Sequence, residues 1–295
     1  MKVRFAVSPS GSAFDAAEFI SFITNLETLG FDGMWLSDIP LGSPIDPVVG
    51  LAFAAAVTET LKLGSNVVPL GRNPLTLAKE LAQIDRLSNG RVLLAFVPGV
   101  DEPGERAALG IVDQNRSESM DESIELCRSF WSGEPVDHTS DRFIYRGARL
   151  STTPLQQPLE IWLGGRGPVA LKRAGRLSDG WLGAGVTPVD CVGAVGRIND
   201  AADEAGRAID PEHFGMSLPY ARSAPPPAMV ARILQRSPNS DINDLLPVGE
   251  EHLRDLVGRY LDSGVSKFVV RSVDQVADWG EELADLASVV IPLQT

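Results

Sequence analysis

Cysteine and histidine are scarce in this chain, which limits the covalent and metal chemistry that it can carry. The 295 residues include two cysteines, Cys127 and Cys191, and three histidines, His138, His213 and His252. The histidines stand far apart, in none of the spacings typical of a zinc site. Two cysteines in helix-like segments favour packing roles over a disulfide framework. The sequence therefore predicts neither a metal centre nor a disulfide-stabilised domain.

Positive charge and long hydrophobic segments are also in short supply. The net charge is −13, whereas nucleic-acid binding depends on Lys and Arg contacts to phosphate, so no nucleic-acid partner is expected. The longest apolar run, residues 48–57 (VVGLAFAAAV), is too short to span a bilayer, so no membrane span is expected. The first residues, MKVRFAV, form a strand pattern rather than a signal peptide, and we expect a cytoplasmic protein.

Strand-like and helix-like patterns alternate along the whole chain. Strands are predicted at residues 3–7, 34–37, 61–68, 92–96, 160–163, 180–182, 214–218 and 267–270, and helices at 14–29, 46–59, 74–87, 118–131, 168–177, 188–207, 250–263 and 273–290. Eight such units predict an α/β protein with one (β/α)₈ TIM-barrel domain over residues 1–295. The alternative, an open doubly wound sheet, needs fewer units and a glycine fingerprint that residues 8–12 (SPSGS) do not match.

Two segments interrupt the alternation and are predicted as insertions. Residues 133–150 include an alternating stretch that favours a small hairpin. Residues 220–247 are rich in Pro and polar residues and follow the seventh predicted strand, so they belong to the barrel face where active sites form. This second insertion is interpreted either as a mobile lid or as a surface excursion without a role.

Two glycine turns follow neighbouring predicted strands. Residues 161–168 (IWLGGRGP) combine a short apolar strand, the glycines Gly164, Gly165 and Gly167, and a proline suited to a helix start. A helix N-terminus attracts phosphate, and Arg166 would add a charge-assisted hydrogen bond. The second turn, residues 183–185 (GAG), has the same chemistry one strand later. The pair predicts a phosphate-bearing cofactor; the alternative is two tight turns without a ligand.

Several segments, taken in order, make the chain resemble the luciferase-like monooxygenase family of flavin- and deazaflavin-dependent proteins. They are residues 29–38 (LGFDGMWLSD), 61–74 (LKLGSNVVPLGRNP), 77–92 (LAKELAQIDRLSNGRV), the two glycine turns, and 264–271 (GVSKFVVR). The resemblance implies a (β/α)₈ barrel that binds coenzyme F420 or FMN over the carboxyl ends of its strands. It also implies a homodimer formed through the predicted helices 46–59 and 74–87.

The resemblance also assigns residues to the cofactor. The phosphate would lie near Gly164, Gly165, Arg166, Gly167, Ala184 and Gly185. Ser65, Asn66 and Val67 match a segment that holds a non-prolyl cis peptide against the ring in many relatives. Asp38 would lie near the ring as the catalytic acid; the alternative is that Asp38 only caps a helix.

The chain departs from the family pattern at two places. Deazaflavin relatives often have His after the acid at the second strand, and this chain has Ile39 there. Many relatives have glycines with an acid after the fourth strand, whereas this chain has Pro98 to Pro103, in which Asp101 or Glu102 would supply the acid. The residue that donates a proton in the family is therefore either missing from this chain or shifted by a residue or two along it.

Three functions are compatible with these features. The first is hydride transfer between coenzyme F420 and a small organic substrate. The alternatives are an FMN-dependent monooxygenase using reduced flavin and O₂, and a non-catalytic flavin- or deazaflavin-binding protein. An isomerase or aldolase barrel would need a base at a strand's carboxyl end, and Lys267 begins its strand instead. No motif in the sequence identifies the substrate.

Overall fold

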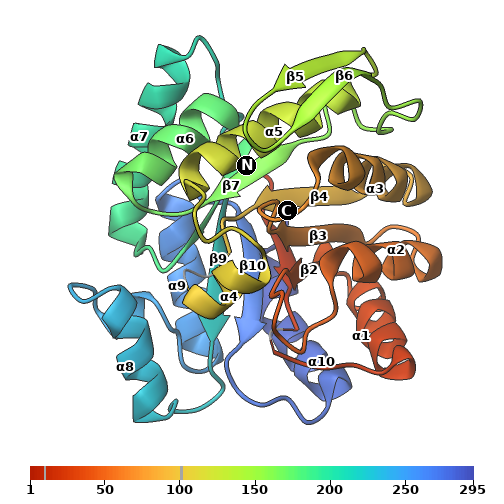
Figure 1. Ribbon diagram of the computed structural model, residues 1–295. Coiled ribbons are helices and arrows are strands. Elements are labelled where there is room, and N and C mark those ends of the chain that lie inside the picture. The colour runs from red at the N-terminus through yellow and green to blue at the C-terminus, as the bar shows by residue number, and fades with distance from the viewer. Residues whose placement is uncertain (10, 100–101) are drawn as a thin grey trace.

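The computed structural model describes residues 1–9, 11–99 and 102–295, and within them parallel strands close into a barrel (Figure 1). The strands stand around the barrel in the order β1-β10-β9-β8-β7-β4-β3-β2. Their bounds are β1 Arg4–Val7, β2 Gly33–Ser37, β3 Lys62–Val67, β4 Val92–Phe96, β7 Ile161–Gly164, β8 Gly180–Ala184, β9 Phe214–Tyr220 and β10 Lys267–Ser272. The predicted (β/α)₈ barrel is confirmed.

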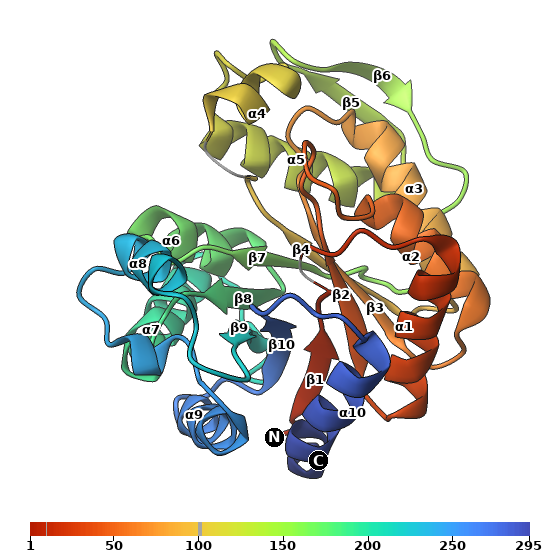
Figure 2. The same ribbon diagram turned by 90° about the horizontal axis from the view of Figure 1, so that it is seen from below.

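Helices cover the outside of the barrel and mostly begin at residues suited to that place. They are α1 Ala16–Thr28, α2 Pro47–Val57, α3 Pro74–Leu87, α5 Arg116–Trp131, α6 Pro168–Leu177, α7 Pro188–Glu204, α9 Glu250–Asp262 and α10 Trp279–Val290. Asp15 and Glu18 form a capping box on α1, and Asn73 caps α3 ahead of its first-turn proline. Both chain ends lie beside β1 and α10 (Figure 2), where Thr295 Oγ1 donates to the Met1 carbonyl at 3.1 Å.

The two predicted insertions are present, and one of them is more ordered than the sequence indicates. The first forms the antiparallel hairpin of β5 Val136–Thr139 and β6 Ile144–Ala148. The second contains α8 Pro227–Arg236 and the 3₁₀ turn η1 Ile242–Asp244, neither of which is predicted. The run of prolines around residue 226 is typical of a loop, yet Pro is well tolerated in the first turn of a helix. The short helix α4 Pro103–Ala108 is also unpredicted, and α10 begins at Trp279 rather than at 273.

Side chains alternate between the barrel lumen and the helix layer along each strand. On β10, Phe268 and Val270 join the large core beneath the helices, whereas Val269 joins a separate cluster with Trp35 and Leu182. Because neighbouring side chains point to opposite faces of a strand, Lys267 and Arg271 share the lumen side with Val269. Lys267 lies at the amino end of the lumen and Arg271 at the carboxyl end, where barrel active sites form.

Arg91 is a buried cation that joins the end of α2 to β3. It is 7% exposed, and its guanidinium donates to the carbonyls of Ala55 (3.2 Å), Thr58 (2.9 Å) and Leu61 (2.9 Å). We expect Arg91→Met to lower the free energy of unfolding by about 2–4 kcal/mol, because several buried carbonyls lose their donor. Urea unfolding measures this. Arg197→Met, which alters an exposed arginine, is the control, and a loss no larger than the control's contradicts the assignment.

Candidate cofactor site

The glycine turn after β7 leaves the N-terminus of α6 open. Gly165 has a φ of +103°, and a Cβ placed on it would lie 2.7 Å from the Ala170 Cβ, so the turn requires glycine there. Gly167 occupies the N-cap position and offers no side chain to the helix. The backbone N–H groups of Arg166, Gly167 and Val169 make no hydrogen bond with any residue that the structure describes. An exposed helix start with free donors is a ready site for phosphate.

Arg166 connects this turn to the second one. Its Nη1 donates to the Gly185 carbonyl at 2.7 Å, and the same guanidinium contacts Ser237 and the carbonyl of Arg236 at the end of α8. A cation at a helix C-terminus is favourable because the carbonyls there carry partial negative charge. The turns at Gly164–Gly167 and Ala184–Gly185 are thus brought together, with Arg166 bound to protein acceptors. A pocket of about 430 Å³ opens beside them, lined also by Arg197 and Ser240.

Asp38 follows β2 and is buried in an ion pair. Its side chain is 3% exposed, and its Oδ2 accepts from Arg72 Nη2 at 2.9 Å and from the Val68 N–H at 3.0 Å. Arg72 also contacts Asp46 at 3.0 Å. Burial acts to lower the pKa of Arg72, but the charges of Asp38 and Asp46 outweigh it and the pKa is raised. The residue that caps α2 is Asp46, through the N–H groups of Val48 and Val49.

The segment Ser65–Val67 lies beside Asp38 at the end of β3. The Asp38 N–H donates to the Asn66 carbonyl at 2.9 Å, and Asn66 Nδ2 donates to Ser37 Oγ at 3.2 Å. Ser65 is fully buried and donates to the Asn66 carbonyl, while Val67 belongs to the core beneath the helices. The cis peptide among the described residues is Gln157–Pro158, so the non-prolyl cis bond of many relatives is absent from this segment.

Arg271 is the cation that projects into the carboxyl end of the lumen. It is half-buried, and its guanidinium makes no hydrogen bond or ion pair with residues 1–9, 11–99 or 102–295. Burial lowers its pKa, and the charges of Arg232 and Arg236 on α8 lower it further. Three arginines that repel one another, and that have no ion pair with an acidic residue in the described part of the chain, favour an anion. The sequence predicts that Arg271 follows the eighth barrel strand. It does not predict that the arginines of α8 lie near it.

The structure describes most of the residues at the two places where the sequence departs from the family pattern. Ile39 is half-exposed just beyond β2 and cannot transfer a proton. Glu102 is exposed at the start of α4, with no side-chain bond to that helix, and Asp101 lies outside the described residues. The sequence gives no sign that Glu105 of α4 is buried, yet it is 7% exposed, and a Cβ on Gly99 would lie 3.0 Å from its Oε1.

The fold and these contacts define a (β/α)₈ barrel with an open helix N-terminus and, at the carboxyl end of β10, an arginine side chain that has no ion pair with a described residue. The family model described as luciferase-like monooxygenase matches residues 1–237, and the chain belongs to that family. Separately, none of the described helices combines the length and apolarity that a membrane crossing requires.

Curated relatives cover part of the chain. The 5,10-methylenetetrahydromethanopterin reductase of Methanolobus tindarius is 33% identical over 192 residues, which is 65% of this chain and 56% of the relative. The F420-dependent glucose-6-phosphate dehydrogenase of Amycolatopsis mediterranei is 29% identical over 61% of this chain and 57% of the relative. The matched region therefore spans a little over half the length of these relatives.

Solved structures share the fold over the whole chain. An F420-dependent secondary alcohol dehydrogenase, solved with an F420-acetone adduct, has a TM-score of 0.81 at 18% identity and covers 100% of both chains. The oxygenating constituent of 3,6-diketocamphane monooxygenase from Pseudomonas putida, solved with FMN, has a TM-score of 0.79 at 16% identity and covers 100% of this chain and 99% of its own. At these identities the likeness concerns the fold alone.

Proposed function

We propose that this protein is an oxidoreductase that transfers a hydride between coenzyme F420 and a small organic substrate. The observation that carries the proposal is the open N-terminus of α6 beside the glycine turn Gly164–Gly167, where a cofactor phosphate would bind. The family membership and the names of the two curated relatives support redox chemistry. Their partial coverage leaves the substrate class open.

The residues of the cradle fit a phosphate by their donors and by their shape. The N–H groups of Arg166, Gly167 and Val169 would bind its oxygens, and Ala184 and Gly185 would border the site. Trp181 Nε1 donates to the Gly165 carbonyl at 2.8 Å, which holds the turn in place before the ligand arrives. When bound, the deazaflavin ring would supply the hydride donor or acceptor. The protein binds and orients it and excludes water.

We propose that Asp38 and Arg271 interact electrostatically with the cofactor ring and the substrate. Asp38 presents a carboxylate whose Oδ1 makes no hydrogen bond with a described residue, beside Ser65, Asn66 and Val67. Arg271 lies in the lumen without an acidic partner among the described residues and would bind an anionic group of cofactor or substrate. These roles follow from position, since catalytic groups collect at the carboxyl ends of barrel strands.

A second candidate is an FMN-dependent monooxygenase, favoured by one observation. Ile39 stands where deazaflavin relatives often have His, and Ile cannot donate a proton. Anaerobic assays with F420 and a panel of alcohols and aldehydes, followed by deazaflavin absorbance, test the first function. Reduced FMN with O₂ and the same panel tests the second. Turnover in the FMN assay alone would replace the F420 proposal.

We also propose a homodimer, in which α2 contributes to the interface. Val49, Phe53 and Val57 lie four residues apart on this helix and are 63%, 37% and 38% exposed. Such an apolar stripe on a solvent-facing helix favours burial against a second copy. The double variant Val49→Lys/Phe53→Lys is expected to sediment as a monomer at micromolar concentration, where the natural chain sediments as a dimer. Val189→Lys, on exposed α7, is the control, and a monomeric natural chain contradicts the proposal.

A further inference from the structure

The amino end of the barrel holds a second cavity, opposite the face that carries the cofactor site. Its volume is about 390 Å³, which lies within the range of small-molecule sites. Several strands contribute their first residues to its lining, including Arg4 of β1, Lys62 of β3 and Lys267 of β10. Its floor is apolar and is made by Trp35, Trp162, Leu93 and Leu182.

Trp35 lines this cavity and carries a buried donor. The residue is 5% exposed, and its Nε1 has no hydrogen-bond partner among the described residues. Its six-membered ring lies so close to Gly64 that a Cβ there would be 2.1 Å away, so the N–H edge faces away from β3. By contrast, Trp162 Nε1 donates to Glu160 Oε2 at 3.1 Å. A buried donor without an acceptor costs about 1–3 kcal/mol, and a ligand acceptor would remove that cost.

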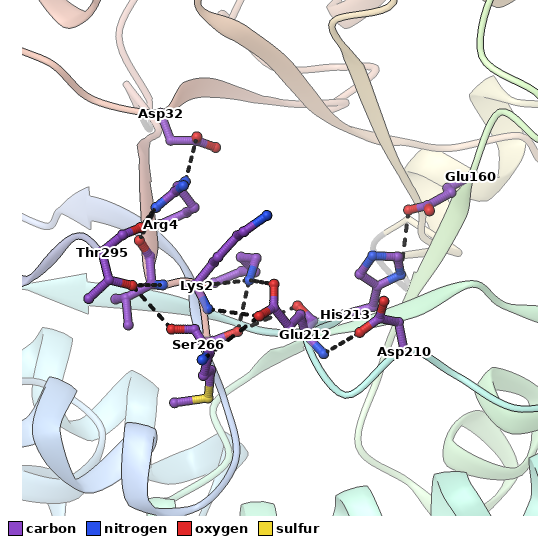
Figure 3. A network of polar contacts seen from close by, with 12 residues as sticks. Lys2, Arg4, Asp32, Glu160, Asp210, Glu212, His213, Ser266 and Thr295 are labelled. Carbon is purple, nitrogen blue, oxygen red and sulfur yellow. Dashed lines mark hydrogen bonds and ion pairs between the residues drawn. The ribbon is translucent and has the colours of Figure 1, made fainter.

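Charged side chains of both signs surround the mouth of the cavity. The charged side chains that line it are Lys2, Arg4, Lys62 and Lys267 against Asp32 and Glu160. Figure 3 shows the Arg4–Asp32 pair and the His213–Glu160 pair apart from each other; their charged atoms lie 3.2 Å and 3.6 Å apart within each pair. Glu212 lies 3.9 Å from Lys267 Nζ, and the charge of Asp210 also acts on that lysine, so carboxylates match the cations in number. Arg4 and Lys267 already have acidic neighbours there, so binding of an anionic ligand would depend on Lys62.

Lys62 is the lysine at this mouth whose ammonium is available to an anion. The Lys62 ammonium makes no hydrogen bond or ion pair with the described part of the chain, although it lies near Asp32. Lys267 Nζ donates to the Lys2 carbonyl at 2.6 Å and to Ser266 Oγ at 2.9 Å. Burial lowers the pKa of Lys267 and raises that of Asp32. A carboxylate bound at this mouth would favour the charged form of Lys267.

We propose that this cavity is a second ligand site, which binds a small aromatic carboxylate that carries a further hydrogen-bond acceptor. The ring packs on the Trp35 and Trp162 indoles, the acceptor takes the Trp35 N–H, and the carboxylate contacts Lys62. Because the site lies at the amino ends of the strands, it is separate from the cofactor face, and its ligand does not take part in hydride transfer. The proposal is independent of the proposed function.

Quinoline-2-carboxylate, which combines a ring nitrogen with a carboxylate, is the first probe, with quinoline and benzoate as partial mimics. We expect quinoline-2-carboxylate to raise the melting temperature and quench tryptophan fluorescence saturably at submillimolar concentration. Each partial mimic binds at least tenfold more weakly, since it lacks one contact. Lys62→Met weakens binding at least tenfold, whereas Lys79→Met on the exposed face of α3 does not. Trp35→Phe keeps the ring and removes the donor, and weakens binding by several-fold.

Two outcomes overturn the proposal. One is the absence of saturable binding of quinoline-2-carboxylate and of a wider set of heteroaromatic acids at millimolar concentration. The other is binding that Lys62→Met leaves unchanged, which would place the probe elsewhere. If Trp35→Phe does not fold, Lys62→Met and its control still decide the question. Binding of F420 to the Lys62→Met variant is expected to match the natural chain, so a failure here is distinguishable from a failure at the cofactor face.

Discussion

The Gly167→Asp variant is expected to fold at least as stably as the natural chain and to bind F420 between about fivefold and several hundredfold more weakly. Aspartate is a preferred N-cap residue, and Gly167 already has the extended backbone of an N-cap, so the side chain can bond to the start of α6. The same carboxylate repels a phosphate held about 4 Å away by about 1–4 kcal/mol in a partly solvated site. Stability and cofactor affinity therefore change in opposite directions.

Two matched variants isolate the cause. Gly167→Asn caps the helix without a charge, so we expect it to lose less affinity than Gly167→Asp. Gly196→Asp adds the same charge on the exposed side of α7, where a Cβ meets no atom within 4 Å, and is expected to leave affinity unchanged. Titration with F420 and thermal melting measure both quantities. A folded Gly167→Asp protein with natural affinity contradicts the phosphate assignment at α6.

The Asp38→Asn variant is expected to lower turnover by about ten- to ten-thousand-fold, the range for losing one acid–base or electrostatic contribution. The structure adds an expected loss of stability of about 1–2 kcal/mol, because Arg72 loses a charged and buried partner while it keeps Asp46. Turnover is measured per folded molecule, with the melting temperature recorded alongside.

Asp46→Asn is the matched control for this effect. It removes the other acidic partner of Arg72 and keeps an N-cap side chain on α2, since Asn is a good cap. Its turnover is expected to stay near that of the natural chain. If Asp38→Asn and Asp46→Asn retain the same turnover, Asp38 only positions Arg72, and the catalytic assignment fails.

Features coded by neighbouring residues could be predicted from the sequence. The bounds of α3 and α6 match the predicted 74–87 and 168–177, because each helix begins with Pro and ends at a local stop signal. The sequence predicts the glycine turn at Gly165 for the same reason, since the residues that form it lie within a few positions of one another.

Features that depend on distant residues could not be predicted. Asp38 and Arg72 are 34 residues apart in the chain, and Arg166 contacts a carbonyl 70 residues away at the end of α8. No periodicity indicates such pairs, because they depend on which loops meet at the end of the closed barrel. Helix α8 itself was missed because its prolines occupy the start of the helix, where they do not break it.

The most direct test of a phosphate-bearing deazaflavin at α6 is a fluorescence titration of the purified protein with F420, with the deazaflavin nucleoside that lacks the phosphate, and with FMN. We predict saturable micromolar binding of F420, weaker binding of FMN, and at least a tenfold loss for the nucleoside, because the N–H groups at Arg166 and Gly167 then lack their anion. Equal affinity for F420 and the nucleoside, or no binding of F420 at all, would contradict the proposed cofactor and its site.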